Sequence, residues 1–180
     1  MNTWILLMRG INVGGKNILP MKVLRELIEG IGGEQVATYI QSGNAVFQHA
    51  EPDSSGLART IRASVSDACG FEPAVLLLSV RQFERVISQN PFVKETADPK
   101  SVHVWFLSEK AGAPDLDGID HVKGNTEQFA LKDDAFYLHA PDGIARSKLA
   151  AKVERLLGVN ATARNWRTVS KLKEIAQAAT

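Results

Sequence analysis

The order of strand-like and helix-like segments in the first half of the chain constrains the fold more than any other feature. Residues 4–8 form a continuous apolar run that ends in a glycine-rich stretch, which is typical of a buried strand. The pattern then predicts a helix at residues 20–31, two short strands joined by a tight turn at residues 36–40 and 45–48, and another strand at residues 74–78. Between the last two strands it predicts a second helix that Asp53 or Ser54 caps and that ends near Cys69. This β-α-β-β-α-β order is that of the split β-α-β, or ferredoxin-like, fold. A further helix should follow, because Ser79 and Gln82 form a capping-box pattern.

The second half of the chain repeats this order in a reduced form. The pattern predicts a hairpin, a helix and a last helix capped by Thr168, with strand-like segments at residues 102–107, 128–131, 135–139 and 161–164. Residues 111–125 are rich in Gly, Pro and Asp and predict a loop or a short irregular helix. We therefore expect an α+β protein of two similar ferredoxin-like subdomains packed together. Residues 1–93 form the first, and residues 94–180 form the second, which has lost one helix. A linker is predicted at residues 90–99, between two Pro-containing pairs.

The bulk composition narrows the classes of protein. The chain has 180 residues, and none of its apolar runs approaches the roughly 20 residues of a membrane-spanning helix. Its first residues lack the basic region and cleavage pattern of a signal peptide. A single cysteine excludes an internal disulfide framework, and the four histidines lack metal-ligand spacing. We therefore predict a cytoplasmic protein without a membrane partner and without a metal site.

Charge is distributed unevenly along a chain whose net charge is only +1. Residues 94–143 hold 5 basic and 10 acidic residues, whereas residues 144–180 hold 8 basic residues and only Glu154 and Glu174 as acidic ones. The basic C-terminal fifth would concentrate anions near it. The alternative is a solvated helix face that pairs with the acidic middle segment.

Residues 10–17 read G-x-x-x-x-G-K-N and fall one residue short of a nucleotide-binding P-loop. Asn17 stands where the motif needs a hydroxyl for magnesium. The residue before Pro20 is pushed away from helical angles, whereas a P-loop runs directly into its helix. The sequence therefore argues against a nucleoside triphosphatase. Two interpretations stay open: a looser anion-binding loop in which Arg9 and Lys16 flank exposed amides, or a structural turn whose glycines adopt positive φ.

Three further polar clusters lie at the ends of predicted elements. Residues 41–44, Gln-Ser-Gly-Asn, are consistent with a hairpin turn or with side chains that face the glycine loop. Residues 146–148, Arg-Ser-Lys, would start a helix whose free N–H groups bind an anion, or would simply cap it. Residues 164–166, Arg-Asn-Trp, are either a recognition cluster with an indole for stacking or an anchor in the core.

Four segments that contain these clusters, taken in order, resemble a known bacterial family. Residues 7–17, 38–47, 137–149 and 162–169 are similar to the motifs of domain of unknown function 1697, and the similarity spans nearly the whole chain. The resemblance implies an α+β fold of two similar subdomains, and it implies no activity. The family's recurring positions map here to Arg9, Gly10, Asn12, Gly14, Gly15, Lys16, Ser42, Gly43, Asn44, Gly143, Ser147, Lys148, Arg164, Asn165 and Trp166. One departure is Arg167, where an amide is expected, so a ligand at that position would be bound differently.

From these residues we expect a protein that binds a small anionic ligand between its two subdomains, such as a nucleotide or another phosphorylated or carboxylated metabolite. The predicted ligand-binding residues are Arg9, Asn12, Gly14, Gly15, Lys16, Ser42, Asn44, Arg146, Ser147, Lys148, Arg164 and Asn165. The sequence shows no paired carboxylates, activated nucleophile or metal cluster, so we assign no catalytic residue and no cofactor, and enzyme activity stays open. The alternatives are an RNA-binding or other nucleic-acid-binding module, which the topology and the basic C-terminal region favour, and a regulatory interaction protein.

Overall fold

The computed structural model describes residues 1–93 and 98–179, and the chain forms two compact units. The first unit holds Met1–Arg85 and Ser170–Thr180, and the second holds Val86–Val169. The C-terminal end of the chain thus belongs to the first unit, whereas the prediction assigned the whole last helix to the second subdomain. The linker predicted at residues 90–99 lies partly outside the described residues, because residues 94–97 are not among them.

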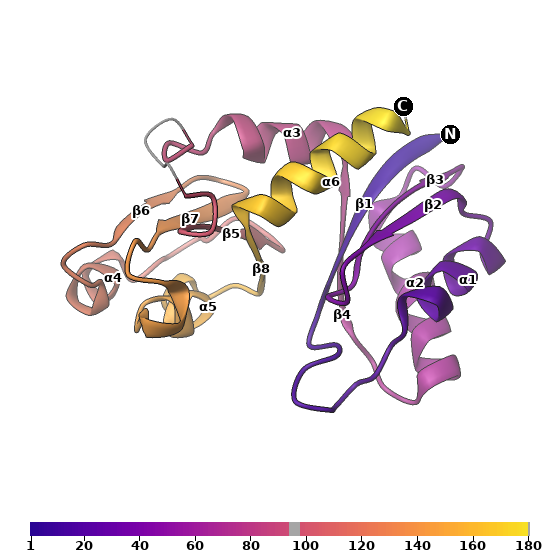
Figure 1. Ribbon diagram of the computed structural model, residues 1–180, viewed down its shortest axis with the longest axis horizontal. Helices are drawn as coiled ribbons and strands as arrows, with labels where there is room; N and C mark the ends of the chain where they lie inside the picture. Colours follow the sequence, from indigo (N-terminus) through magenta and orange to yellow (C-terminus); the bar gives the residue numbers. More distant parts are fainter. Residues whose placement is uncertain (94–97, 180) are drawn as a thin grey trace. The chain divides into compact units, whose positions relative to one another are not determined.

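The first unit is built on a four-stranded antiparallel sheet with the strand order β2-β3-β1-β4 (Figure 1). Its elements are β1 (Asn2–Arg9), α1 (Met21–Gly30), β2 (Glu34–Tyr39), β3 (Asn44–His49), α2 (Ser54–Cys69), β4 (Ala74–Ser79) and the start of α3 (Val80–Ser88). Strand β1 is central and pairs antiparallel with both β3 and β4. This order of elements and strands confirms the predicted split β-α-β arrangement.

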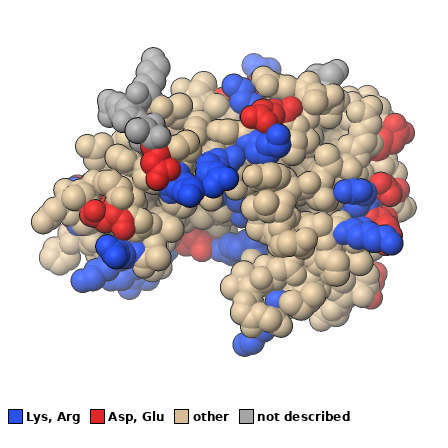
Figure 2. All heavy atoms as spheres, viewed as in Figure 1, with Lys and Arg blue, Asp and Glu red and all other residues tan. Residues whose placement is uncertain are grey.

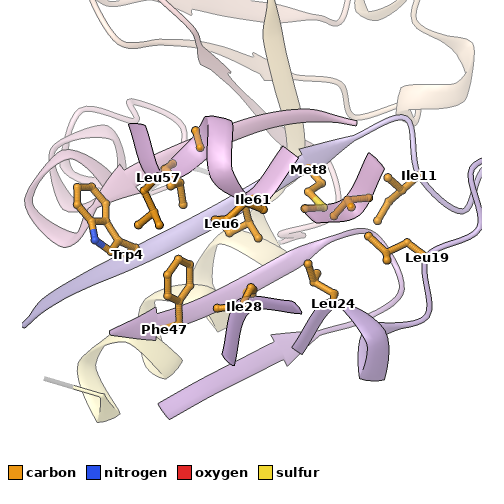
Figure 3. Packing of buried hydrophobic residues seen from close by; sticks show 14 of the residues in the cluster. Trp4, Leu6, Met8, Ile11, Leu19, Leu24, Ile28, Phe47, Leu57 and Ile61 are labelled. Carbon is orange, nitrogen blue, oxygen red and sulfur yellow. The ribbon is translucent and has the colours of Figure 1, made fainter. Parts of the chain in front are cut away.

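The core of the first unit lies between this sheet and the helices α1 and α2 (Figure 3). Trp4, Leu6 and Met8 point into it from β1, because every second side chain of a strand lies on the same face of the sheet. The helices contribute buried side chains at helical spacing, which are Leu24 and Ile28 of α1 and Leu57 and Ile61 of α2. Asp53 caps α2, and its carboxylate accepts hydrogen bonds from the N–H groups of Ser55 and Gly56.

The second unit has the same strand order, β6-β7-β5-β8. Its elements are β5 (Val102–Leu107), α4 (Leu116–Val122), β6 (Gln128–Leu131), β7 (Ala135–His139), the 3₁₀ turns η1 (Ile144–Arg146) and η2 (Ala150–Lys152), α5 (Val153–Leu157), β8 (Ala161–Asn165) and the start of α6 (Trp166–Ala178). Its core brings Trp105 and Phe136 of the sheet together with Ile119 of α4 and Leu156 of α5. The two units are therefore similar, as the sequence predicted.

Three local predictions differ from the structure. The prediction that the second subdomain has lost one helix was wrong, because α4 lies there, capped by Asp115, and Ile119 is its only fully buried side chain. The helix expected at Arg146 is instead two 3₁₀ turns followed by α5, which has 5 residues. The last helix was predicted to be capped by Thr168, but it begins at Trp166, and the Oδ1 atom of Asn165 accepts the N–H of Thr168 at 2.9 Å.

Candidate functional site

The glycine loop after β1 folds into a small hairpin. Val13 and Lys16 pair across its tip, where the N–H of Lys16 donates to the carbonyl of Val13 at 3.1 Å. Gly14 and Gly15 between them have φ values of 58° and 73°, and two consecutive positive values are typical of a type I′ turn. These values fit the interpretation of the loop as a structural turn whose glycines adopt positive φ. The loop also does not run into a helix, because α1 begins only at Met21.

Asn12 fastens this hairpin to the turn between β2 and β3. Its Nδ2 atom donates to the carbonyl oxygens of Leu19 and Gln41, and its Oδ1 atom accepts the N–H of Leu19, each at 2.8 Å. In the turn itself, the Nδ2 atom of Asn44 donates to the Oγ atom of Ser42 at 2.8 Å. The structure therefore brings these two predicted clusters together, and their amide groups hold the main chain in place.

The hydrogen-bonding residues predicted in the second unit also bind the chain itself. The Oγ atom of Ser147 accepts the N–H of Ala150 at 2.9 Å, and Asn165 caps α6 through Thr168. The Nη1 atom of Arg164 donates to the carbonyl of the preceding residue at 2.8 Å. Burial lowers the pKa of Arg164 to about 10, so this guanidinium is still charged at neutral pH. Five residues that were expected to orient a ligand thus make hydrogen bonds within the chain: Asn12, Ser42, Asn44, Ser147 and Asn165.

Two of the predicted cations, by contrast, line an open cavity on the second unit. This cavity of about 550 Å³, which we name the basic pocket, is lined by His121, Val122, Lys123, Gly124, Asn125, Glu127, Arg146, Lys148 and Lys152. Four cations and one carboxylate give its lining a formal charge of +3 with the histidine neutral. In Figure 2, Lys and Arg side chains gather over the part of this unit that holds α4 and the 3₁₀ turns, at the lower left.

The cations of the basic pocket are available to a ligand. Within the described part of the chain, Arg146, Lys148 and Lys152 form no ion pair and no side-chain hydrogen bond. Among the same residues, Lys123 has one loose contact, 3.9 Å from its Nζ atom to the exposed carboxylate of Asp120. The carboxylate of Glu127 is buried and accepts the N–H of its own loop at 2.8 Å, so it stabilises that loop and pairs with none of these cations.

A second cavity of about 300 Å³ adjoins the basic pocket. The two share one wall, made of Gly124, Asn125, Glu127 and Arg146. The rest of this adjoining pocket is lined by Thr126, Ala140, Asp142, Gly143 and Ser147. The hydroxyl of Thr126 donates to the Oδ2 atom of Asp142 at 2.6 Å, which ties the loop before β6 to the loop after β7.

The predicted site residues thus fall into separate places. Arg146, Ser147 and Lys148 line the two pockets, whereas the predicted residues of the first unit and those at the end of β8 do not. Sequence reasoning missed Lys123 and Lys152, which complete the cationic lining. Lys123 caps the C-terminal end of α4, a helix that the sequence pattern left uncertain, so no periodicity pointed to it.

Among residues 1–93 and 98–179, no three His, Cys, Asp or Glu side chains come together in a way that would hold a metal ion. None of the helices in this part of the chain is both long enough and apolar enough to cross a bilayer.

Comparisons with known proteins concern the family and the fold. The family model described as "Protein of unknown function (DUF1697)" matches residues 1–137. The solved structure of the conserved bacterial protein SP0830 from Streptococcus pneumoniae is 24% identical to this chain. Its TM-score is 0.74, and the alignment covers 97% of this chain and 98% of that one. At this identity the likeness shows the fold alone. No sequence among curated proteins matches the chain.

Proposed function

We propose that this chain, which belongs to the DUF1697 family of unknown function, binds a small phosphorylated ligand in the basic pocket. The observation that carries this proposal is that Arg146, Lys148 and Lys152 line one cavity together with Lys123 and have no acidic partner in the described part of the chain. Like charges gathered around a recess raise the local potential unless an anion neutralises them.

The size and chemistry of the basic pocket support a small ligand. Its volume of about 550 Å³ lies in the range of pockets that hold metabolites, roughly 300–1,000 Å³. Hydrogen bonds to charged groups contribute about 1.5–3 kcal/mol each, more than neutral ones. A phosphate offers several acceptor oxygens, and Arg146 adds a planar fork of donors that matches them.

The alternative of an RNA-binding module has weaker support. Ferredoxin-like sheets that recognise single-stranded RNA stack bases on aromatic side chains. Here the aromatic side chains Phe47, Trp105 and Phe136 of the central strands are buried in the cores of the two units. A basic surface that attracts any polyanion would still bind RNA, but only through charge, and salt would abolish that binding.

Isothermal titration calorimetry tests the proposal. The probes are pyrophosphate, ribose 5-phosphate and a short single-stranded RNA, each titrated at low and at high salt. We expect at least one phosphorylated small molecule to bind at both salt concentrations. The double variant Lys148→Ala/Lys152→Ala should weaken that binding by about tenfold or more, since each 1.4 kcal/mol lost is a factor of ten.

A matched control separates the pocket from overall charge. The double variant Lys100→Ala/Lys132→Ala removes two exposed lysines of the same unit that line neither pocket. It should leave the affinity within about twofold. Equal losses in the two double variants would refute the proposal, and so would binding that disappears in high salt for every probe.

A further inference from the structure

The two cavities of the second unit differ in chemistry across their shared wall. The basic pocket has a formal lining charge of +3. The adjoining pocket has one cation, Arg146, and two carboxylates, Asp142 and Glu127, so its formal lining charge is −1. It is also lined by Thr126 and Ser147, whose hydroxyl groups bond to Asp142 and to the N–H of Ala150. A ligand that spans both cavities must therefore be anionic at one end and carry hydrogen-bond donors at the other.

From this contrast we infer that the ligand is a phosphate ester of a polyhydroxylated compound, a sugar phosphate, with its phosphate in the basic pocket and its hydroxyl groups in the adjoining pocket. This inference rests on the proposed function and deepens it by naming the class of ligand. A second phosphate in the adjoining pocket would meet two carboxylates and would be repelled. Sugar hydroxyls, by contrast, can donate hydrogen bonds to these carboxylates, because an ionised carboxylate only accepts.

Asp142 is the residue best placed to select the hydroxylated end. Its Oδ2 atom accepts the hydroxyl of Thr126 at 2.6 Å, which fixes the carboxylate in the loop. Its Oδ1 atom has no hydrogen-bond partner among the described residues, so it can accept from a ligand hydroxyl. Glu127 is less available, because its Oε2 atom accepts the N–H of Gly124 at 2.8 Å and its side chain is buried.

The shared wall holds the two groups that would contact the junction of sugar and phosphate. Arg146 has no acidic partner in the described part of the chain and borders both cavities, so it would donate to the ester phosphate. Asn125 is exposed and also borders both cavities. Its side-chain amide can donate a hydrogen bond to a phosphate oxygen and accept one from a sugar hydroxyl. Gly143, with φ 93° and no atom within 4 Å of where a Cβ would lie, leaves the adjoining pocket open.

Calorimetric titration of the full chain with inorganic phosphate, ribose 5-phosphate and glucose 6-phosphate tests the inference. We expect at least one sugar phosphate to bind about tenfold more tightly than inorganic phosphate. Asp142→Asn should weaken the binding of that sugar phosphate by about fivefold or more. The same substitution should strengthen the binding of inorganic phosphate, because a negative charge near it is removed. These opposite changes cannot come from a fold that is merely damaged.

The control Asp117→Asn removes an exposed carboxylate of α4 that lines neither cavity, and it should change neither affinity by more than about twofold. Three results would overturn the inference. Equal affinities for inorganic phosphate and both sugar phosphates would refute the sugar phosphate while leaving the proposed anion site in place. Parallel changes for all ligands in Asp142→Asn would refute the role of Asp142. Failure of every phosphate compound to bind would refute the proposed function as well.

Discussion

Replacing Asn12 by alanine would remove three hydrogen bonds of 2.8 Å at once, two donated to Leu19 and Gln41 and one accepted from Leu19. Because Leu19 is fully buried, its N–H and carbonyl groups would lose their partner without gaining water. At about 1 kcal/mol for each bond, the loss is about 3 kcal/mol. The residue also has φ 52°, and alanine tolerates that conformation less well by about 1 kcal/mol. We therefore expect the free energy of unfolding to fall by about 4 kcal/mol.

Urea denaturation followed by far-ultraviolet circular dichroism measures this loss. Asn12→Gly separates its two parts, because glycine accepts the positive φ but makes none of the side-chain bonds; it should lose about 3 kcal/mol. The control Asn125→Ala makes the same chemical change at an exposed residue whose side chain has no hydrogen bond to the described residues, and the free energy of unfolding should stay within about 0.5 kcal/mol of the unmodified chain. A loss below about 1 kcal/mol in Asn12→Ala, with reduced affinity for a ligand, would refute the structural role and restore Asn12 to a binding site.

Two further predictions concern the core of each unit. Gly43→Ala should lower the free energy of unfolding by about 3 kcal/mol, because the residue has φ 72° and a Cβ there would lie 2.6 Å from a side-chain carbon of β1. The control Gly70→Ala, with φ 74° and open space around its Cβ position, should lower it by about 1 kcal/mol. Equal losses by urea denaturation would contradict this prediction. Burial lowers the pKa of His103 below its ordinary 6.5, so the unfolded chain binds more protons and stability should fall as the pH drops below about 6.5. In His103→Gln, the difference between the urea midpoints at pH 8 and pH 5 should be smaller than in the unmodified chain. An equal difference in the two proteins would refute this prediction.

The strands were predictable because each leaves a local signature. The ranges predicted for β5, β6 and β7 coincide with the structure, since apolar runs of four to six residues between turn residues fix both ends of a strand. Helix α4 was harder, because a helix of 7 residues with one fully buried side chain has too little periodicity to stand out. The start of α6 shows a further limit: Asn165 and Thr168 are both good capping residues, and their types do not say which one accepts the hydrogen bond at the start of the helix.

The candidate site was predictable only in part, for two physical reasons. An asparagine or serine in a glycine-rich segment suits a ligand and a turn equally well, and the sequence does not say whether its partner is the main chain, as for Asn44. Charge summed along a segment was also misleading. Lys123 lies in a stretch with a net charge of −5, yet acidic neighbours such as Asp115 cap a helix and do not line the pocket. The electrostatics of a pocket depend on its lining in space.

Because the two units share one fold, the loops that line the proposed site in the second unit can be compared with the equivalent loops of the first. Both pockets lie where the loop before β6 meets the loop after β7, and these strands pair at that end through Gln128 and His139. The equivalent pair in the first unit is Glu34 and Gln48, and the loops beside it, residues 31–33 and 50–53, contain no Lys or Arg. These loops of the first unit thus hold no counterpart of Lys123, although α2 after them carries Arg59 and Arg62. Because the proposed site uses Lys123 as well as the cations that follow β7, calorimetry should find one phosphate ligand per chain, and Lys148→Ala/Lys152→Ala should weaken that single site. Two equivalent sites per chain would show that binding follows the shared topology and would refute the assignment to the second unit.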